Sequence, residues 1–255
     1  MELVIRRQKL VVGDAHTGFW EVFRDGKWEE STLDTFDRYL SGKTVFLDIG
    51  AWIGPTTLYA AATAKRVIAI EADPVAAGLL RKNVALNPTL SARIEILERA
   101  VFAHDGTLRI GSKGSTGDSM SSVFFAENEN SWEVETITPS EIRAKIGDGE
   151  SVFLKIDIEG AEYHLLPAIA PLLALPDITA LIAFHPSFLP GNKLMRWLKS
   201  LFLTQKAFKP FADFTVLQVR KTGIHQPVWL NFLHRLGLAY VSADDTYLFV
   251  RTAPP

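Results

Sequence analysis

Three acidic motifs in the sequence combine the residue types that bind a nucleoside and remove a proton. The first is D-I-G-A-W-I-G, which begins at Asp48 and contains Gly50 and Gly54. Glycine at these positions permits a tight turn and lets the backbone approach a ligand at a helix N-terminus. The second motif begins near Glu71, 21 residues after Gly50, where a carboxylate can accept both hydroxyl protons of a ribose. This spacing predicts a pocket for a ligand that contains a nucleoside.

The charge at the first turn indicates which nucleoside is bound. NAD carries a pyrophosphate, and the Rossmann motif G-x-G-x-x-G places that anion at the turn. The carboxylate of Asp48 would repel a pyrophosphate, and the third glycine of the motif is absent. S-adenosylmethionine has no phosphate, and its sulfonium and ammonium groups are cations that a nearby acid stabilises. We therefore expect S-adenosylmethionine as the cofactor, with an NAD-type oxidoreductase on a similar scaffold as the alternative.

The third group of polar residues follows two other expected strands. Asp157 and Glu159 come directly after V-F-L-K-I, and His185 follows I-T-A-L-I-A-F. Methyl transfer to a hydroxyl needs a proton acceptor, because the pKa of a hydroxyl lies far above neutrality. We expect Asp157, Glu159 or His185 to be that base or to contact the acceptor. The same side chains could bind a divalent metal such as Mg²⁺, but no metal is predicted because their spacing is not diagnostic.

Alternating apolar and helical segments from Val45 onward predict a doubly wound α/β fold with a mostly parallel sheet. Ligands of such folds bind beyond the carboxyl ends of the strands, where the three motifs lie. We expect residues 45–255 to form one main domain. Its expected strands are 45–49, 66–71, 93–102, 152–157 and 178–186. Its expected helices are 55–64, 75–87, a helix from about 161, 194–202 and 227–237, and 239–252 is expected to form a hairpin that turns at Asp244 and Asp245.

Residues 1–44 are expected to form a small β/α extension of this domain. Segments 10–19 and 19–30 carry alternating apolar positions, and Asp25 and Gly26 have the residue types of a tight hairpin turn. Ser31 is then expected to cap a helix that continues to Tyr39. The Gly- and Ser-rich segment 111–122 is too polar for a core. It is expected to be a mobile surface loop, either one that closes over the substrate or a simple insertion.

The motifs D-I-G-A-W-I-G, I-E-A-D-P and L-K-I-D-I-E-G-A-E together resemble those of the FkbM family of class I S-adenosylmethionine-dependent methyltransferases. The resemblance extends from about residue 45 to residue 186, and the motifs occur in the order found in the family. It implies a seven-stranded sheet with an antiparallel C-terminal hairpin. It also implies O-methylation of a hydroxyl on a sugar, a glycan or a natural product.

The family motifs can be transferred to individual residues of this sequence. Trp52 departs from the family, which more often has a small polar residue there. The resemblance places the cofactor turn at Asp48, Gly50 and Gly54, the ribose acid at Glu71, the adenine side near Ala100 and Val101, and the motif after the fourth strand at Asp157, Glu159, Gly160 and Glu162.

Composition excludes several other classes of protein. With 255 residues and 47% hydrophobic content the chain can bury a large core, which excludes a disordered or fibrous protein. The absence of cysteine excludes disulfides, zinc–thiolate sites and cysteine nucleophiles. A net charge of −2 argues against a nucleic-acid partner. We expect a cytoplasmic protein, because the N-terminus lacks signal-peptide features and no apolar window could span a membrane.

The charge is unevenly distributed along the chain. Between His185 and Arg235 there are eight Lys or Arg residues and one acid, so this stretch carries +7 and the remainder −9. The stretch either packs an apolar face on the sheet with a solvated basic rim, or contacts an anionic acceptor or a membrane surface. A noncatalytic interaction protein that retains the cofactor pocket is a further alternative to the enzyme.

Overall fold

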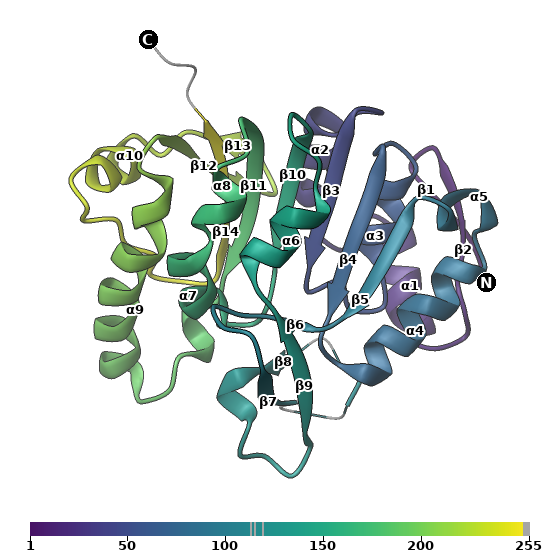
Figure 1. Cartoon of the computed structure of the whole chain (residues 1–255), viewed down its shortest axis with the longest axis horizontal. Helices are drawn as coiled ribbons and strands as arrows, with labels where there is room; N and C mark the ends of the chain where they lie inside the picture. Colours follow the sequence, from purple (N-terminus) through teal and green to yellow (C-terminus); the bar gives the residue numbers. More distant parts are fainter. Residues whose placement is uncertain (113, 115, 119, 252–255) are drawn as a thin grey trace.

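The computed structural model describes residues 1–112, 114, 116–118 and 120–251, and its central sheet is covered by helices on both faces (Figure 1). The sheet order is β13-β12-β14-β11-β10-β3-β4-β5. The five strands from β11 to β5 are parallel, and β14 is antiparallel to both of its neighbours. The strands are β3 (Thr44–Ile49), β4 (Arg66–Glu71), β5 (Ile94–Glu98), β10 (Ser151–Ile156), β11 (Asp177–Phe184), β12 (Phe214–Arg220), β13 (Gly223–His225) and β14 (Asp245–Arg251).

The expected doubly wound α/β fold is confirmed. Among the described residues the sheet has eight strands, one more than expected, because the three-residue β13 extends its edge. One face is covered by α1 (Thr17–Arg24), α2 (Glu30–Tyr39), α3 (Pro55–Ala61) and α4 (Pro74–Ala85). The other face is covered by α6 (Pro139–Lys145), α7 (Glu162–Leu165), α8 (Ala170–Leu173) and α9 (Lys193–Phe208). The remaining helices are α5 (Pro88–Ser91) and α10 (Val228–Arg235).

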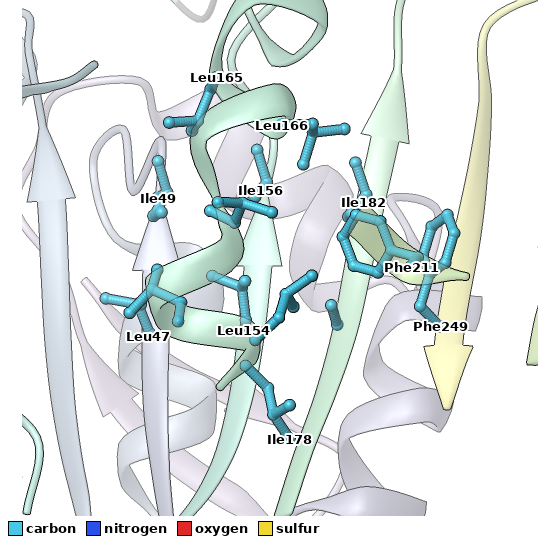
Figure 2. Packing of buried hydrophobic residues seen from close by; sticks show 14 of the residues in the cluster. Leu47, Ile49, Leu154, Ile156, Leu165, Leu166, Ile178, Ile182, Phe211 and Phe249 are labelled. Atoms are coloured by element: carbon cyan, nitrogen blue, oxygen red, sulfur yellow. The ribbon is translucent and has the colours of Figure 1, made fainter. Parts of the chain in front are cut away.

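The burial of strand β3 explains why its sequence is almost entirely apolar. All six of its residues are buried, because both faces of the sheet are covered. Leu47 and Ile49 point to one face, where they lie beside Leu154 and Ile156 of β10 (Figure 2). Phe46 points to the other face and packs against Phe36 of α2, with ring centroids 5.0 Å apart. The core on this second face is shared by residues 1–44 and the main domain, and the expected boundary at residue 44 stays a prediction.

The N-terminal hairpin forms at a different place from the one expected. Strands β1 (Glu2–Ile5) and β2 (Gln8–Val11) are joined by a two-residue turn. The expected second strand is instead helix α1, because Trp20 and Phe23 are three residues apart and both are buried on one helical face. Gly26, with φ of 65°, follows the end of this helix and does not turn a hairpin.

The expected hairpin at 239–252 was also wrong. Only its second half is a strand, β14, which pairs with β11 and β12. The first half packs on α9, because Ala239 and Val241 are buried and the carbonyl of Val241 accepts a hydrogen bond from Ser200 Oγ at 2.5 Å. These contacts keep that segment away from the sheet.

A second, smaller sheet lies beside the site. Its order is β6-β9-β7-β8, with strands β6 (Ala100–Val101), β7 (Thr107–Ser112), β8 (Ser121–Ser122) and β9 (Ser131–Ile137). The Gly- and Ser-rich segment 111–122 includes the end of β7 and all of β8, and its residues 113, 115 and 119 lie outside the described residues. Within the described ranges, no helix combines the length and hydrophobicity needed to cross a membrane.

Candidate active site

A cavity of about 220 Å³ opens beyond the carboxyl ends of β3, β4 and β10. This is the position expected for the ligand of a doubly wound sheet. The structure therefore brings together residues from all three sequence motifs. Six of the nine predicted site residues line the cavity: Gly50, Glu71, Ala100, Val101, Asp157 and Glu159.

The two glycines of the first motif both adopt a left-handed backbone, and at Gly50 the neighbouring backbone also leaves no room for a side chain. Gly50 has φ of 82°, and a Cβ atom on it would lie 1.9 Å from the carbonyl oxygen of Asp157. Gly54 has φ of 95°, and a Cβ there would lie 2.5 Å from Leu80 Cδ1. No side chain fits at Gly50 unless the ends of β3 and β10 separate. Gly54 lies outside the cavity lining, so its contact with a cofactor stays a prediction.

We predict that Gly50→Ala strongly destabilises the protein. The overpacking costs about 1–3 kcal/mol or more, and the left-handed backbone adds about 1–2 kcal/mol. The free energy of unfolding, measured in urea, should fall accordingly. Gly78→Ala in helix α4 is the matched control, because a Cβ atom at Gly78 would meet nothing within 4 Å and its φ is not positive. That variant should gain about 0.5–1 kcal/mol. Equal stabilities for the two variants would contradict the packing argument.

Glu71 ends β4 and holds the first turn. Its Oε2 accepts a hydrogen bond from the backbone N–H of Trp52 at 2.7 Å, and its Oε1 accepts one from the backbone N–H of Asp73 at 2.8 Å. Burial raises the pKa of Glu71 to about 7, although these backbone donors oppose the shift. The backbone N–H of Ala72 also lowers the pKa. A carboxylate has about four acceptor sites, and the bonds from Trp52 and Asp73 use one on each oxygen, so part of the acceptor capacity remains for a ligand.

Asp73 has two roles, because it caps a helix and also holds the segment after β7. Its Oδ1 accepts hydrogen bonds from the backbone of Val75 and Ala76 and so caps α4. Its Oδ2 accepts one from Gly117 N at 2.7 Å. Because Ser121 and Ser122 line the cavity, the described part of the 111–122 segment is packed at the site. Whether the segment covers a substrate or is a simple insertion stays a prediction.

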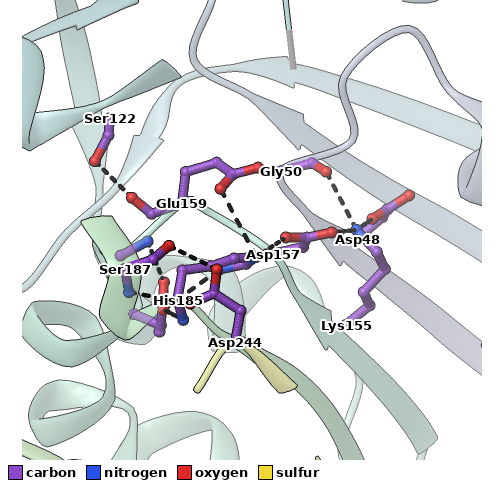
Figure 3. Close-up of polar contacts among 11 residues, drawn as sticks. Asp48, Gly50, Ser122, Lys155, Asp157, Glu159, His185, Ser187 and Asp244 are labelled. Atoms are coloured by element: carbon purple, nitrogen blue, oxygen red, sulfur yellow. Dashed lines mark hydrogen bonds and ion pairs between the residues drawn. The ribbon is translucent and has the colours of Figure 1, made fainter. Parts of the chain in front are cut away.

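Asp48 is fully buried behind the cavity wall. Its Oδ2 accepts hydrogen bonds from the hydroxyls of Thr56 and Thr57 at 2.8 and 2.7 Å. Its Oδ1 lies 3.3 Å from Lys155 Nζ, which also lies 3.6 Å from Asp157 Oδ2 (Figure 3). Burial opposes the charge of Lys155, but Asp48 and Asp157 raise its pKa above the usual value. Asp48 does not line the cavity and acts on it only by holding the lining residues Lys155 and Thr56, so its direct contact with a cofactor stays a prediction.

The third motif meets His185 at the end of β11 (Figure 3). His185 Nε2 lies 3.6 Å from Asp157 Oδ1 and 3.7 Å from Glu159 Oε2. Its Nδ1 lies 3.4 Å from Glu162 Oε1, and its backbone N–H donates to the same oxygen at 2.6 Å. Asp157, Glu159 and His185 each offer one ligand atom, and these atoms lie within 4.8 Å of one another. The geometry is compatible with either acid–base chemistry or a divalent ion.

The surrounding carboxylates determine the protonation of this cluster. Burial lowers the pKa of His185, but the Glu162, Asp157 and Glu159 carboxylates raise it to about 10. His185 is therefore an imidazolium at neutral pH. Burial raises the pKa of Glu159 to about 7, with His185 lowering it and Asp157 raising it. Near neutral pH a substantial fraction of Glu159 is ionised, as a general base must be.

Comparison with known proteins establishes the family. The model of the methyltransferase FkbM domain matches residues 48–209, which is more than half of the chain. The chain belongs to the FkbM methyltransferase family. The solved methyltransferase FkbM from Methylobacillus flagellatus KT is 17% identical with a TM-score of 0.50, and the match covers 82% of this chain and 44% of that one. This chain therefore spans less than half of that protein, and the likeness at this identity shows the fold.

Two further solved structures resemble the chain more weakly. Precorrin 8w decarboxylase from Methanobacterium thermoautotrophicum is 14% identical with a TM-score of 0.43, covering 89% of this chain and 90% of its own. SMU.1697c from Streptococcus mutans, in complex with SAH, is 11% identical with a TM-score of 0.45, covering 88% and 97%. No protein of curated function matches the sequence.

Other residues of this FkbM family member also line the cavity, although the sequence motifs do not point to them. Lys155 lines the cavity and bridges Asp48 and Asp157. The sequence did indicate an unusual role for Lys155, because a lysine within an apolar strand is buried and needs a charged or hydrogen-bonding partner. Phe19 and Glu29 of the N-terminal extension also line the cavity, and Phe19 packs on Trp52 with ring centroids 4.6 Å apart. Nothing in the spacing of residues 1–44 indicates that they reach the motifs of the main domain.

Proposed function

We propose that this methyltransferase uses S-adenosylmethionine to methylate a hydroxyl group. The observation that carries the proposal is the pair of carboxyl groups at one cavity. Glu71 has free lone pairs suited to a ribose, and Glu159 has a pKa near 7 suited to removing a proton. Glu71 binds the methyl donor, and Glu159 removes the proton from the acceptor.

The cavity wall fits the proposed donor. The oxygens of Glu71 can accept the two hydroxyl protons of a ribose while they hold the turn at Trp52. Ala100 and Val101 offer a largely apolar surface for adenine. Bound S-adenosylmethionine supplies a methyl group attached to a positively charged sulfur. The nearby Asp157 carboxylate favours such a cation, and Gly50 leaves the backbone free to approach it.

Glu159 is the residue that we assign as the base. His185 is protonated at neutral pH and can donate a hydrogen bond but not accept the hydroxyl proton. Glu159 lines the cavity with φ of 51°, a left-handed backbone that its neighbours maintain. Ser122 Oγ, for example, donates a hydrogen bond to the Glu159 carbonyl at 2.7 Å. The imidazolium of His185, 3.7 Å from Glu159, then holds the carboxylate in place.

The cavity lining carries charges of both signs. Glu29, Asp157 and Glu159 line it together with the cations Lys155 and Arg99, and His185 lies within 3.7 Å of Asp157 and Glu159. These charges do not select between a neutral and an anionic acceptor. We propose a hydroxylated small molecule, a glycan or a natural product. The exclusion of nucleic acid and the cytoplasmic location stay predictions.

Calorimetry with S-adenosylhomocysteine tests the donor half of the proposal. Glu71→Ala should weaken binding about 10²-fold, because charged hydrogen bonds contribute about 1.5–3 kcal/mol each. Affinity of the wild type should rise as the pH passes through about 7, since only the ionised carboxyl accepts both ribose hydroxyls. Glu98→Ala is the matched control, because this strand-end acid pairs with Arg81 and lies outside the cavity lining.

The same experiment separates the alternatives. Unchanged binding in Glu71→Ala would contradict the ribose assignment. Binding of NAD in place of S-adenosylhomocysteine would favour the oxidoreductase. Binding of S-adenosylhomocysteine without methyl transfer to any hydroxylated acceptor would favour the noncatalytic interaction protein.

A further inference from the structure

Exposed apolar side chains are concentrated at one end of the molecule. Among the described residues, ten of the sixteen exposed large hydrophobic side chains lie between residues 194 and 238. Figure 1 shows α9 and α10 together at the end opposite the N-terminal hairpin. We call this surface the α9–α10 face, and its apolar members are Leu194, Met195, Trp197, Leu198, Phe202, Val228, Trp229, Phe232, Leu236 and Leu238.

Helix α9 presents one apolar stripe outward. Leu194, Leu198 and Phe202 follow one another at intervals of four residues and are 64%, 45% and 57% exposed. The opposite side of the helix is buried through residues such as Thr204 and Phe208. The core therefore leaves the outer stripe without a partner.

The orientation of helix α10 is fixed by hydrogen bonds to β12 and to the segment that follows α9. Its Asn231 side chain accepts a hydrogen bond from Val216 N at 2.8 Å and donates one to Val216 O at 2.6 Å. His234 is buried beneath it, with Nε2 2.8 Å from the carbonyl of Phe211. These contacts turn Trp229 outward, where it is 77% exposed, and Phe232 is exposed beside it.

Basic residues surround the apolar side chains of this face. Lys206 Nζ lies 4.4 Å from the ring centroid of Phe202, and Lys193, Arg196 and Arg235 are also exposed. The region from His185 to Arg235 carries +7 in a chain whose net charge is −2. A two-fold dimer through this face would place like charges opposite one another. Exposed tryptophan and phenylalanine rimmed by lysine and arginine match the interface of an anionic bilayer.

We propose that the α9–α10 face binds the surface of membranes that contain anionic phospholipid. The aromatic and aliphatic side chains enter the interface between headgroups and acyl chains, and the basic residues contact the phosphates. The binding is peripheral, since the apolar residues lie on the outer side of short helices. It does not depend on the proposed methyl transfer.

Sedimentation with lipid vesicles tests this inference on the full chain. The protein should bind vesicles of phosphatidylcholine and phosphatidylglycerol at least tenfold more tightly than vesicles of phosphatidylcholine alone. The double variant Trp229→Ser/Phe232→Ser and the variant Lys193→Gln/Lys206→Gln should each lose at least tenfold in affinity. Added salt should weaken binding of the wild type. Circular dichroism and thermal unfolding check that each variant is folded.

Two control variants make the result specific. Val4→Ser/Val22→Ser removes exposed apolar side chains at the other end of the molecule and should leave vesicle binding unchanged. Glu71→Ala should also bind vesicles normally, so failure of the proposed function leaves this result intact. Equal binding to both vesicle types, or no loss in the folded face variants, would overturn the inference. Reversible dimers that disappear in Trp229→Ser/Phe232→Ser, without lipid binding, would assign the face to a second copy of the chain instead.

Discussion

Glu159→Gln should lower methyl-transfer turnover by about 10²–10⁴-fold, the usual contribution of a general base. The amide keeps the size of the side chain but cannot accept a proton. Affinity for S-adenosylhomocysteine should change much less, because Glu71 holds the donor in the proposed complex. Transfer of label from S-adenosylmethionine to a panel of phenols and glycosides, at saturating donor, measures the effect. Glu133→Gln, an exposed carboxyl on β9, is the matched control and should retain full activity.

The pH profile supplies an independent readout of the same residue. A base acts when it is deprotonated, and burial raises the pKa of Glu159 to about 7. Turnover of the wild type should therefore rise with pH through about 7 and then level off. His185, with a pKa raised to about 10 by the carboxylates around it, should stay protonated across this range. A Glu159→Gln variant with normal turnover, or an unchanged pH profile, would assign the proton to another group.

A chelator distinguishes acid–base chemistry from a metal at the same three side chains. A divalent ion at Asp157, Glu159 and His185 must displace the proton of the imidazolium before it can bind. Since that proton is strongly held, we expect turnover at pH 7 to be unaffected by EDTA. If activity were lost with EDTA and restored by Mg²⁺, Glu159 would be assigned as a metal ligand and not as the base.

Lys155→Met should reduce the free energy of unfolding by about 3–5 kcal/mol, the usual cost of breaking a buried ion pair on one side. Lys155 is 4% exposed and Asp48 is fully buried, so the variant leaves the Asp48 carboxylate without its cation. Unfolding in urea measures the loss. Lys145→Met, which breaks a surface pair with Glu95, should cost about 0–1 kcal/mol.

A double variant tests whether the loss comes from the uncompensated charge. Asp48→Asn removes that charge, so Lys155→Met/Asp48→Asn should be more stable than Lys155→Met alone. If the double variant were as unstable as the sum of the two single variants, packing and not charge would explain the effect. This outcome would also weaken the argument that Asp48 influences the cavity through Lys155.

Much of the site could be predicted from local motifs. The predictions failed for segments whose structure depends on contacts with residues distant in the sequence. The turn at Gly50 and the strand end at Glu71 depend on neighbours in sequence and on the parallel order of strands, which apolar periodicity indicates. The alternating apolar residues of segment 19–30 predict β structure with a hairpin turn at Asp25 and Gly26, yet the burial of Trp20 and Phe23 on one face makes the part up to Arg24 a helix. Val241 likewise packs on α9, and no pattern within residues 239–244 encodes that contact.

The sequence by itself determined the doubly wound fold, the family, and the meeting of Glu71, Asp157 and Glu159 beyond the strand ends, because parallel strands place their carboxyl ends on one edge. Only the tertiary structure decided how these groups are charged. The pKa of His185 depends on burial and on charges from distant segments, because the Glu162 and Asp157 carboxylates stabilise its protonated form. Behind the cavity wall, Lys155 pairs with Asp48. The same holds for the α9–α10 face, because a sequence shows that a helix is apolar but not which of its sides the core leaves uncovered.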